Sequence, residues 1–218
     1  MFVVDHQTGS MHAVRADKQR DLLDGALRVF ARDGYSRASI DALADAAGVS
    51  TRTIYNHYAD KAGLFRAVIL DSATRVAEHE IALADRLLGR IADLEQDLIA
   101  FGTAWSTPDP ATADHFALVR QIHADSAHID TDTLTAWQEA GPLRVRRALA
   151  AHLRTHANAG LLRIDDDNVA ALHLIELTAA SVAAAPETSP KHLVRAGVTA
   201  FLAAYENRNT PGRRRGAR

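Results

Sequence analysis

The sequence predicts an all-α protein of about nine helices, with a small three-helix head followed by a larger helical domain. Apolar residues recur at spacings of three and four along most of the 218 residues, which is the period of an amphipathic helix. The sequence has no runs that alternate apolar and polar residues between turn signals, as half-buried strands do. Six prolines and twelve glycines leave few residues that could break helices.

The head is expected over residues 15–60 and begins with two helical patterns. The first covers about residues 15–32 and ends at Gly34, because glycine adopts a positive φ without strain. Ser39 is expected to cap the second helix, and Gly48 to end it within ten residues. A third, shorter helix follows, capped by Ser50 or Thr51.

The larger domain is expected over residues 61–206 and is helical throughout. Its first helix runs from Lys61 to about Leu88 and is capped by Asp60. Further helices are predicted near residues 91–105, 111–124, 131–140, 142–158, 165–184 and 191–206. The two ends, residues 1–14 and 207–218, lack apolar periodicity and are expected to be disordered arms.

Composition excludes several classes of function. The chain contains no cysteine, which excludes disulfides, thiolate metal sites and cysteine nucleophiles. It has neither an apolar run long enough to span a membrane nor a signal peptide, so we expect a cytoplasmic protein without a membrane partner. Nucleotide-binding glycine loops, nucleophile elbows and paired catalytic carboxylates do not occur in the sequence. We therefore expect neither an enzyme nor a cofactor.

Charge is distributed unevenly along the chain. The net charge is -2 overall, but residues 1–70 carry +1, residues 71–207 carry -8 and residues 208–218 carry +5. A neutral head remains compatible with binding to nucleic acid, because a basic face can be balanced by acidic residues behind it. The charge therefore neither supports nor excludes such a function.

The segment from Ser39 to Lys61 has the pattern of a helix-turn-helix. Ala47, Gly48 and Val49 combine a small residue, a residue that tolerates positive φ and a small apolar plug, which together allow a sharp turn between two short helices. The helix after the turn is short and rich in hydrogen-bond donors, as insertion into the DNA major groove requires. Its outward residues are Ser50, Thr51, Arg52, Thr53, Asn56 and His57.

These residues resemble the DNA-binding domain of TetR/AcrR-type bacterial transcriptional regulators. The resemblance covers residues 18–70 and rests on many spaced positions, so it is more specific than a lone helix-turn-helix pattern. The residues that carry it are Phe30, Gly34, Tyr35, Ser39, Ile40, Leu43, Ala44, Ala47, Gly48, Val49, Ser50, Thr53, Ile54, Tyr55, Tyr58, Asp60, Lys61 and Leu64. It implies a helix-turn-helix DNA-binding domain joined to a helical regulatory and dimerisation domain.

The resemblance also implies a role for each residue of the head. The phosphate contacts would come from Ser39, Tyr55, His57 and Lys61. The base edges would be read by Thr51, Arg52, Thr53 and Asn56. Arg52 is the strongest candidate for direct readout, since arginine can bind guanine O6 and N7 bidentately, for about 1–3 kcal/mol of discrimination.

Two positions depart from the family pattern. Ala62 and Gly63 stand at the start of the fourth helix, where the family usually has an acidic residue after the lysine. Glycine there is expected to weaken the helix start by up to about 1 kcal/mol. Tyr58 stands where phenylalanine is common, and its added hydroxyl is expected to reach water or a phosphate.

A single head reads one half-site, so two-fold symmetry must come from another part of the chain. The last two helices carry apolar stripes with small residues that permit close helix approach. These stripes could line the interior of one subunit, or they could pair across a dimer as a four-helix bundle, which the layout of the family favours. The candidate interface residues are Leu172, Ile175, Ala179, Val182, Ala183, Val194, Gly197, Val198, Phe201, Leu202 and Tyr205.

The middle helices hold most of the aromatic residues outside the head and could line a cavity for a small molecule. The candidate residues are Phe101, Trp105, Phe116, Arg120, His123 and Trp137, although ordinary core packing explains each of them equally well. An apolar wall with one arginine and one histidine suits a weakly acidic or aromatic effector.

The sequence therefore predicts a ligand-responsive repressor that binds a pseudo-palindromic DNA operator as a homodimer and is released by a small apolar or aromatic effector. One alternative is a metal-responsive or ligand-independent DNA-binding protein. His152 with His156, and His173 with Glu176, have spacings that can share a metal, but no third ligand stands at an obvious spacing. An enzyme is the alternative that the sequence supports least.

Overall fold

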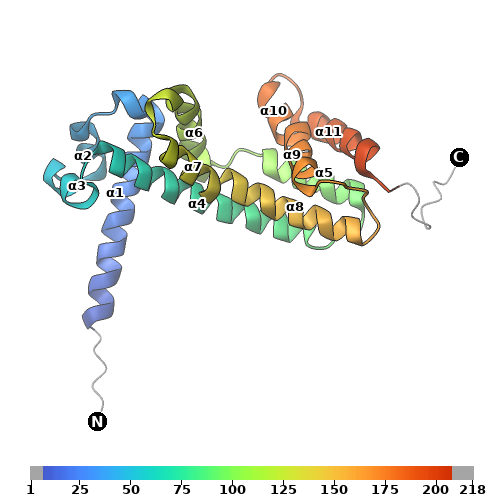
Figure 1. The fold of residues 1–218 in the computed structure, drawn as a ribbon, viewed down its shortest axis with the longest axis horizontal. Helices are drawn as coiled ribbons and strands as arrows, with labels where there is room; N and C mark the ends of the chain where they lie inside the picture. Colours follow the sequence, from blue (N-terminus) through green and yellow to red (C-terminus); the bar gives the residue numbers. More distant parts are fainter. Residues whose placement is uncertain (1–6, 208–218) are drawn as a thin grey trace, which may run out of the picture. The chain divides into compact units, whose positions relative to one another are not determined.

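The computed structural model describes residues 7–207, and their side chains from Lys18 onward. Short 3₁₀ segments precede and follow α6, and the π-helical segment η3 (Glu176–Ala180) joins α9 to α10. Within residues 7–207 the only strand-like pairing is a bridge between Leu162 and Glu206, so the predicted all-α class is confirmed. The helices (Figure 1) are α1 Gln7–Arg37, α2 Ile40–Ala47, α3 Thr51–Tyr58, α4 Lys61–Leu88, α5 Leu94–Ser106, α6 Ala113–Asp125, α7 Thr131–Ala140, α8 Pro142–Asn158, α9 Asp167–Ile175, α10 Ser181–Ala184 and α11 Pro190–Tyr205.

The two expected disordered ends need correction where the structure describes them. Helix α1 begins at Gln7, so residues 7–14 are helical; they contain no proline, and the helix propagates through them. Asn207 is held by the loop after α8, because its backbone amide donates to Leu161 O at 3.1 Å and its side-chain amide donates to Gly160 O at 3.1 Å. The predictions for residues 1–6 and 208–218 lie outside the described residues.

Contacts divide the chain into two compact units whose border differs from the one we expected at residue 60. Among the described residues, the first unit comprises residues 7–76 together with Asp109–Gly141, and the second comprises Ala77–Pro108 and residues 142–207. Helices α6 and α7 join the head because their apolar residues, Trp137 among them, share its core. The helix α4 is continuous and contributes to both units.

The core of the first unit is built around aromatic rings from α1 and α4. Phe30 packs edge-to-face on Phe65 with ring centroids 4.9 Å apart, and Tyr35 lies 4.8 Å from the same ring. Polar contacts tie α4 to its neighbours: Arg75 donates to Asp24 of α1 at 2.7 Å. These contacts hold α1 and α4 together, and α2 and α3 pack against the same apolar core.

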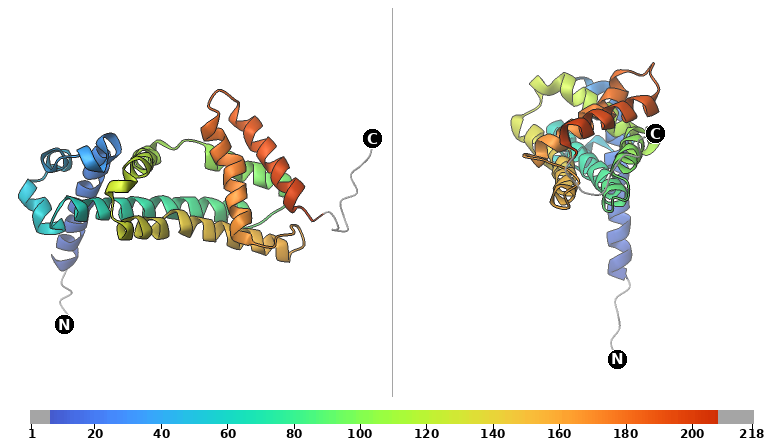
Figure 2. Two further views of the ribbon diagram at one scale, coloured as in Figure 1. Left: turned by 45° about the horizontal axis from the view of Figure 1, so that its top comes forward. Right: turned by 90° about the vertical axis from the view of Figure 1, so that its right-hand side faces the viewer.

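The second unit packs α5, α8, α9 and α11 around a second apolar core, in which Phe101 and Phe201 are fully buried. Helix α8 lies beside the later part of α4 (Figure 2), where His156 donates from Nε2 to Leu88 O at 2.8 Å. An ion pair between Arg154 and Asp167 joins α8 to α9.

Helix α11 approaches the helical run α9–η3–α10 so closely that one glycine is required. A Cβ atom at Gly197 would stand 1.8 Å from the carbonyl oxygen of Leu177, which lies inside the π-helical turn. Gly102 of α5 is similarly confined, since its Cβ would stand 2.9 Å from the Val194 side chain. Backbone contact between helices therefore sets the spacing of this unit.

A carboxyl group on α4 makes the stability of the protein depend on pH. Burial raises the pKa of Glu80 from its ordinary value of 4.5 to about 7. The folded state therefore binds this proton more tightly than the unfolded state, and the resulting stabilisation is present below pH 4.5 and is lost as the pH rises to about 7. In Glu80→Gln we expect a free energy of unfolding about 2 kcal/mol above wild type at pH 8, and this gain should shrink towards pH 4.5.

Chemical denaturation of both proteins between pH 4.5 and 8 measures this difference. The burial-lowered pKa of His115, about 4, affects both proteins equally and cancels. Glu78→Gln is the matched control, because Glu78 lies two residues away and its side chain is 61% exposed. A Glu80→Gln gain that does not change with pH would contradict the prediction.

Candidate nucleic-acid interface

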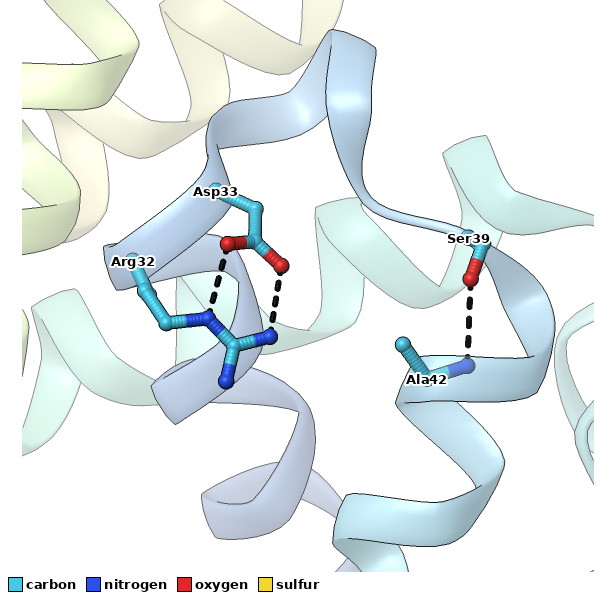
Figure 3. A network of polar contacts seen from close by, with 4 residues as sticks. All are labelled: Arg32, Asp33, Ser39 and Ala42. Atoms are coloured by element: carbon cyan, nitrogen blue, oxygen red, sulfur yellow. Dashed lines mark hydrogen bonds and ion pairs between the residues drawn. The ribbon is translucent and has the colours of Figure 1, made fainter.

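The two short helices of the head are capped by serine side chains, as the sequence predicts. Ser39 Oγ accepts from Ala42 N at 3.1 Å at the start of α2 (Figure 3). Ser50, rather than Thr51, caps α3: its Oγ accepts from Thr53 N at 3.2 Å. The Ser39 hydroxyl keeps its own proton available for a further acceptor, whereas Ser50 Oγ also lies 2.9 Å from Thr53 Oγ1, with which it shares a hydrogen bond.

The turn between α2 and α3 depends on Gly48, and here too the structure agrees with the prediction. Gly48 has φ 63° and ψ 31°, the left-handed region that glycine favours. The two amides of the turn donate back to α2, from Gly48 to Asp45 O at 3.2 Å and from Val49 to Ala44 O at 3.0 Å. Both amides of this sharp turn therefore find partners without a longer loop.

Helix α3 is anchored by one apolar residue and exposes its polar ones. Ile54 is fully buried in the core of the first unit. Tyr55 is 52% exposed, although it is a large aromatic side chain. Among the residues predicted to contact DNA, those exposed on this helix or its cap are Ser50, Arg52, Tyr55, Asn56 and His57, while Thr51 and Thr53 are half-buried.

Lys61 does not belong to this exposed set. Its ammonium group is half-buried and donates to backbone carbonyls at the end of α1, among them Tyr35 O at 3.0 Å and Ala38 O at 3.1 Å. The sequence could not show this, because the acceptors are backbone atoms more than twenty residues away.

The junction between α3 and α4 contains two features that the periodicity does not reveal. Ala59 has φ 60° and ψ -49°, and Asp60 N donates across it to Tyr58 O at 2.6 Å, which makes a γ-turn that is rare for a residue other than glycine. Gly63, which we expected only to weaken α4, is required here, since its Cβ would stand 2.2 Å from Tyr58 O. Asp60 Oδ1 accepts from Gly63 N at 2.7 Å and caps α4 as predicted.

The Tyr58 side chain faces the first unit, and the contact of its hydroxyl with water or a phosphate stays a prediction. The side chain is partly buried in the first unit, and this burial raises the pKa of its hydroxyl above the ordinary value, while an interaction with the Gln19 side chain of α1 lowers it. The departure from phenylalanine thus adds a contact between α3 and α1.

The residues predicted to line an effector cavity fall into the two units. Phe101 and Trp105 of the second unit pack together, with ring centroids 5.0 Å apart, and Phe101 is fully buried. Trp137 of the first unit is buried 6.0 Å from the His123 ring. Arg120 and Phe116 are exposed. A cavity formed by all six remains a prediction.

A small pocket does occur in the second unit, at a place that the sequence does not suggest. Its volume is about 270 Å³, and none of the predicted effector residues lines it. The residues around it are Arg163, Asp165, Asp166, Val169, Ala204 and Tyr205.

The stripe on α11 that we expected at a dimer interface is buried within the chain itself. This applies to Val194, Gly197, Val198, Phe201 and Leu202, which pack against α5 and η3. Of the other interface candidates, Leu172 and Ala183 are exposed, while Ile175, Ala179, Val182 and Tyr205 are half-buried. Amphipathicity marks the buried face of a helix but does not show whether the neighbour belongs to the same subunit.

The histidines that suggested a metal site take part in other contacts. His152 Nε2 lies 2.8 Å from Asp85 Oδ1, and His173 Nδ1 lies 2.7 Å from the Tyr205 hydroxyl. In the part of the chain with described side chains, His, Asp and Glu residues form no group of three that could hold a metal ion. No helix among residues 7–207 is both long enough and apolar enough to cross a membrane.

A capped helix-turn-helix that presents a polar, exposed second helix is the arrangement found in one class of DNA-binding proteins. Two family descriptions match the chain: "Bacterial regulatory proteins, tetR family" over residues 22–68 and "AefR-like transcriptional repressor, C-terminal domain" over residues 96–207. The chain belongs to the TetR family of bacterial transcriptional regulators. Both family descriptions name transcriptional regulators, in agreement with the predicted class of function.

Individual relatives support the same assignment. The chain is 35% identical over 82 residues to the transcriptional repressor AcnR of Corynebacterium glutamicum, a match that covers 37% of this chain and 44% of the relative. It is 37% identical over 79 residues to a helix-turn-helix transcriptional repressor of Mycobacterium tuberculosis, covering 36% and 41%. These matches thus span less than half the length of the relatives.

A solved structure extends the likeness over nearly the whole chain. A TetR-family transcriptional regulator from Mesorhizobium loti superposes with a TM-score of 0.75 at 27% identity, covering 88% of this chain and 98% of the other. The likeness therefore includes the second unit as well as the head.

Proposed function

We propose that the protein is a repressor that binds a pseudo-palindromic operator as a homodimer in the bacterial cytoplasm. The observation that carries the proposal is the exposed face of α3, where Arg52 and Asn56 lie one turn apart immediately after a capped, glycine-dependent turn. Arginine and asparagine are the side chains that bind guanine and adenine bidentately in the major groove.

Two-fold symmetry is proposed to come from the outward faces of α9 and α11. Val169 and Leu172 are 42% and 39% exposed on α9, although both are apolar. On α11 the outward positions include the small residues Ala196 and Ala200, which permit close approach of a second helix pair. The dimer would place two α3 helices about 34–36 Å apart, on successive major grooves.

Release is proposed to follow from a small apolar or aromatic effector that favours a different separation of the two heads. The effector must bind the two states with unequal affinity, since equal affinity shifts no equilibrium. A coupling of roughly 1–3 kcal/mol would weaken operator binding about 5–150-fold. The helix α4 is the natural lever, because it is continuous from the head into the second unit.

Selection of bound fragments from random duplex DNA tests the proposal. The wild-type protein should enrich an inverted repeat, and Arg52→Ala should lose preference at one base pair of each half-site, at a cost of about 1–3 kcal/mol. The loss arises because alanine cannot donate to guanine O6 and N7. His128→Ala is a matched control, because His128 is also exposed in the first unit but lies outside the head helices. No enriched sequence, or an unchanged preference in Arg52→Ala, would contradict the proposed readout.

A further inference from the structure

The turn that leads from α1 into α2 receives polar side chains from two other helices. It comprises residues 34–38, that is, the end of α1 from the non-helical Gly34 onward together with Ala38, which directly precedes the capping residue of α2. Lys61, the first residue of α4, donates to Tyr35 O at 3.0 Å, to Ser36 O at 3.4 Å and to Ala38 O at 3.1 Å. A second side chain comes from α6: Asp125, at the end of this helix, accepts from the backbone amide of Ser36 at 3.2 Å.

The ammonium group of Lys61 has no donor left for DNA in this arrangement. An ammonium carries three N–H bonds, and three backbone carbonyls lie within 3.4 Å of Nζ. The ring of Tyr35 covers it as well, with the ring centroid 4.8 Å from Nζ. A phosphate contact would require at least one of these carbonyls to lose its partner.

The carboxylate of Asp125 lies close to Gly34, a residue whose positive φ favours glycine. Gly34 is buried and has φ 77°. A Cβ atom at this position would stand 2.8 Å from Asp125 Oδ2 and 2.9 Å from Gln121 Oε1. The end of α6 is therefore seated directly on the turn, and a displacement of α6 would break the bond to the Ser36 amide.

We propose that Lys61 and Asp125 are positioning residues for DNA binding, which together clamp the α1–α2 turn. The clamp sets the direction in which the chain enters α2, and α2 in turn carries α3. Lys61 acts through the turn and does not contact a phosphate. The inference rests on the proposed operator binding, and it makes that binding depend on the position of α6.

Salt dependence of operator binding separates this role from a phosphate contact. Affinities of wild type, Lys61→Met and Asp125→Ala for the selected duplex are measured from 50 to 300 mM salt. A lost phosphate contact would reduce the slope of log K against log salt by about one. The clamp predicts that Lys61→Met binds about tenfold more weakly with an unchanged slope.

Asp125→Ala provides the sharper test, because the two explanations predict opposite signs. Removal of a negative charge from the DNA-binding unit should strengthen binding if only long-range electrostatics matter. The clamp predicts that binding weakens by about tenfold. Lys191→Met is the control for a lost positive charge, since Lys191 is exposed on α11 in the other unit.

Hydrogen exchange tests the clamp without DNA. The Ser36 amide should exchange faster in Asp125→Ala, and amides of residues 36–42 should exchange faster in Lys61→Met, while Lys191→Met leaves them unchanged. If the wild-type protein binds no duplex, the proposed function is wrong. The clamp is then tested only by the amide hydrogen exchange of the two variants. Unchanged exchange in both variants, or a slope reduced by about one in Lys61→Met, would overturn the inference.

Discussion

Gly197→Ala should lower the free energy of unfolding by about 3 kcal/mol, although the same substitution normally stabilises a helix by about 1 kcal/mol. The reversal of sign follows from the position of Leu177, whose carbonyl oxygen would stand 1.8 Å from the new Cβ. This oxygen belongs to the backbone of a π-helical turn, so it cannot rotate away. Either α11 must move outwards, or the π-helical turn must rearrange.

Thermal unfolding measures the effect, and we expect the melting temperature to fall by roughly 6–12 °C. Thr199→Ala is the matched control: it lies two residues further along α11, is exposed, and should stay within about 0.5 kcal/mol of wild type. If Gly197→Ala proved more stable than wild type, the close packing of α11 on the π-helical turn could not be correct. Loss of dimers alone, with unchanged stability, would likewise contradict an interior role for this face.

Features that act over three or four residues could be predicted from the sequence. The caps at Ser39 and Asp60 follow from side chains that bond the backbone within the same turn. The bounds of α4 and α8 agree with the apolar period because each helix buries one continuous stripe. The exposed face of α3 follows in the same way from one buried residue, Ile54.

Partners distant in sequence could not be predicted. The sequence shows a lysine at the start of α4 but not that its acceptors are carbonyls at the end of α1. The stripe on α11 indicates a buried face, and the structure shows that the burial occurs within the subunit. In the same way, nothing in the period of α6 and α7 shows that they complete the core of the head. In each case the local pattern shows whether a surface is apolar or charged, but it does not show which part of the protein contacts that surface.

Glycines show most clearly why a periodic pattern does not reveal contacts between residues that are distant in sequence. Gly25 lies within the apolar stripe of α1, where a glycine appears to be a mild defect of the helix. The structure shows instead that α2 crosses α1 at this point, with Ala46 O and Ala47 Cα only 2.5 and 2.6 Å from where a Cβ would be. The small size of residue 25 therefore sets the distance between the two helices.

Gly25→Ala should for this reason impair DNA binding more than a defect in stability alone would. Both atoms that the new methyl group meets belong to the backbone of α2, so α2 must shift as a whole and α3 with it. We expect a loss of about 2–3 kcal/mol in unfolding free energy. Affinity for the selected duplex should fall at least about tenfold even at a temperature where the variant is fully folded, since a misplacement of about 1 Å in a recognition element is costly.

Fluorescence anisotropy with the selected duplex, together with circular dichroism to verify folding, measures both effects. Gly160→Asn is the matched control outside the DNA-binding helices: Gly160 also has a positive φ of 78°, a Cβ there meets nothing within 4 Å, and it lies in the second unit. Its affinity should stay close to wild type. If Gly25→Ala instead kept full affinity, the orientation of α3 would not depend on the crossing of α1 and α2, where the backbone of α2 lies against residue 25.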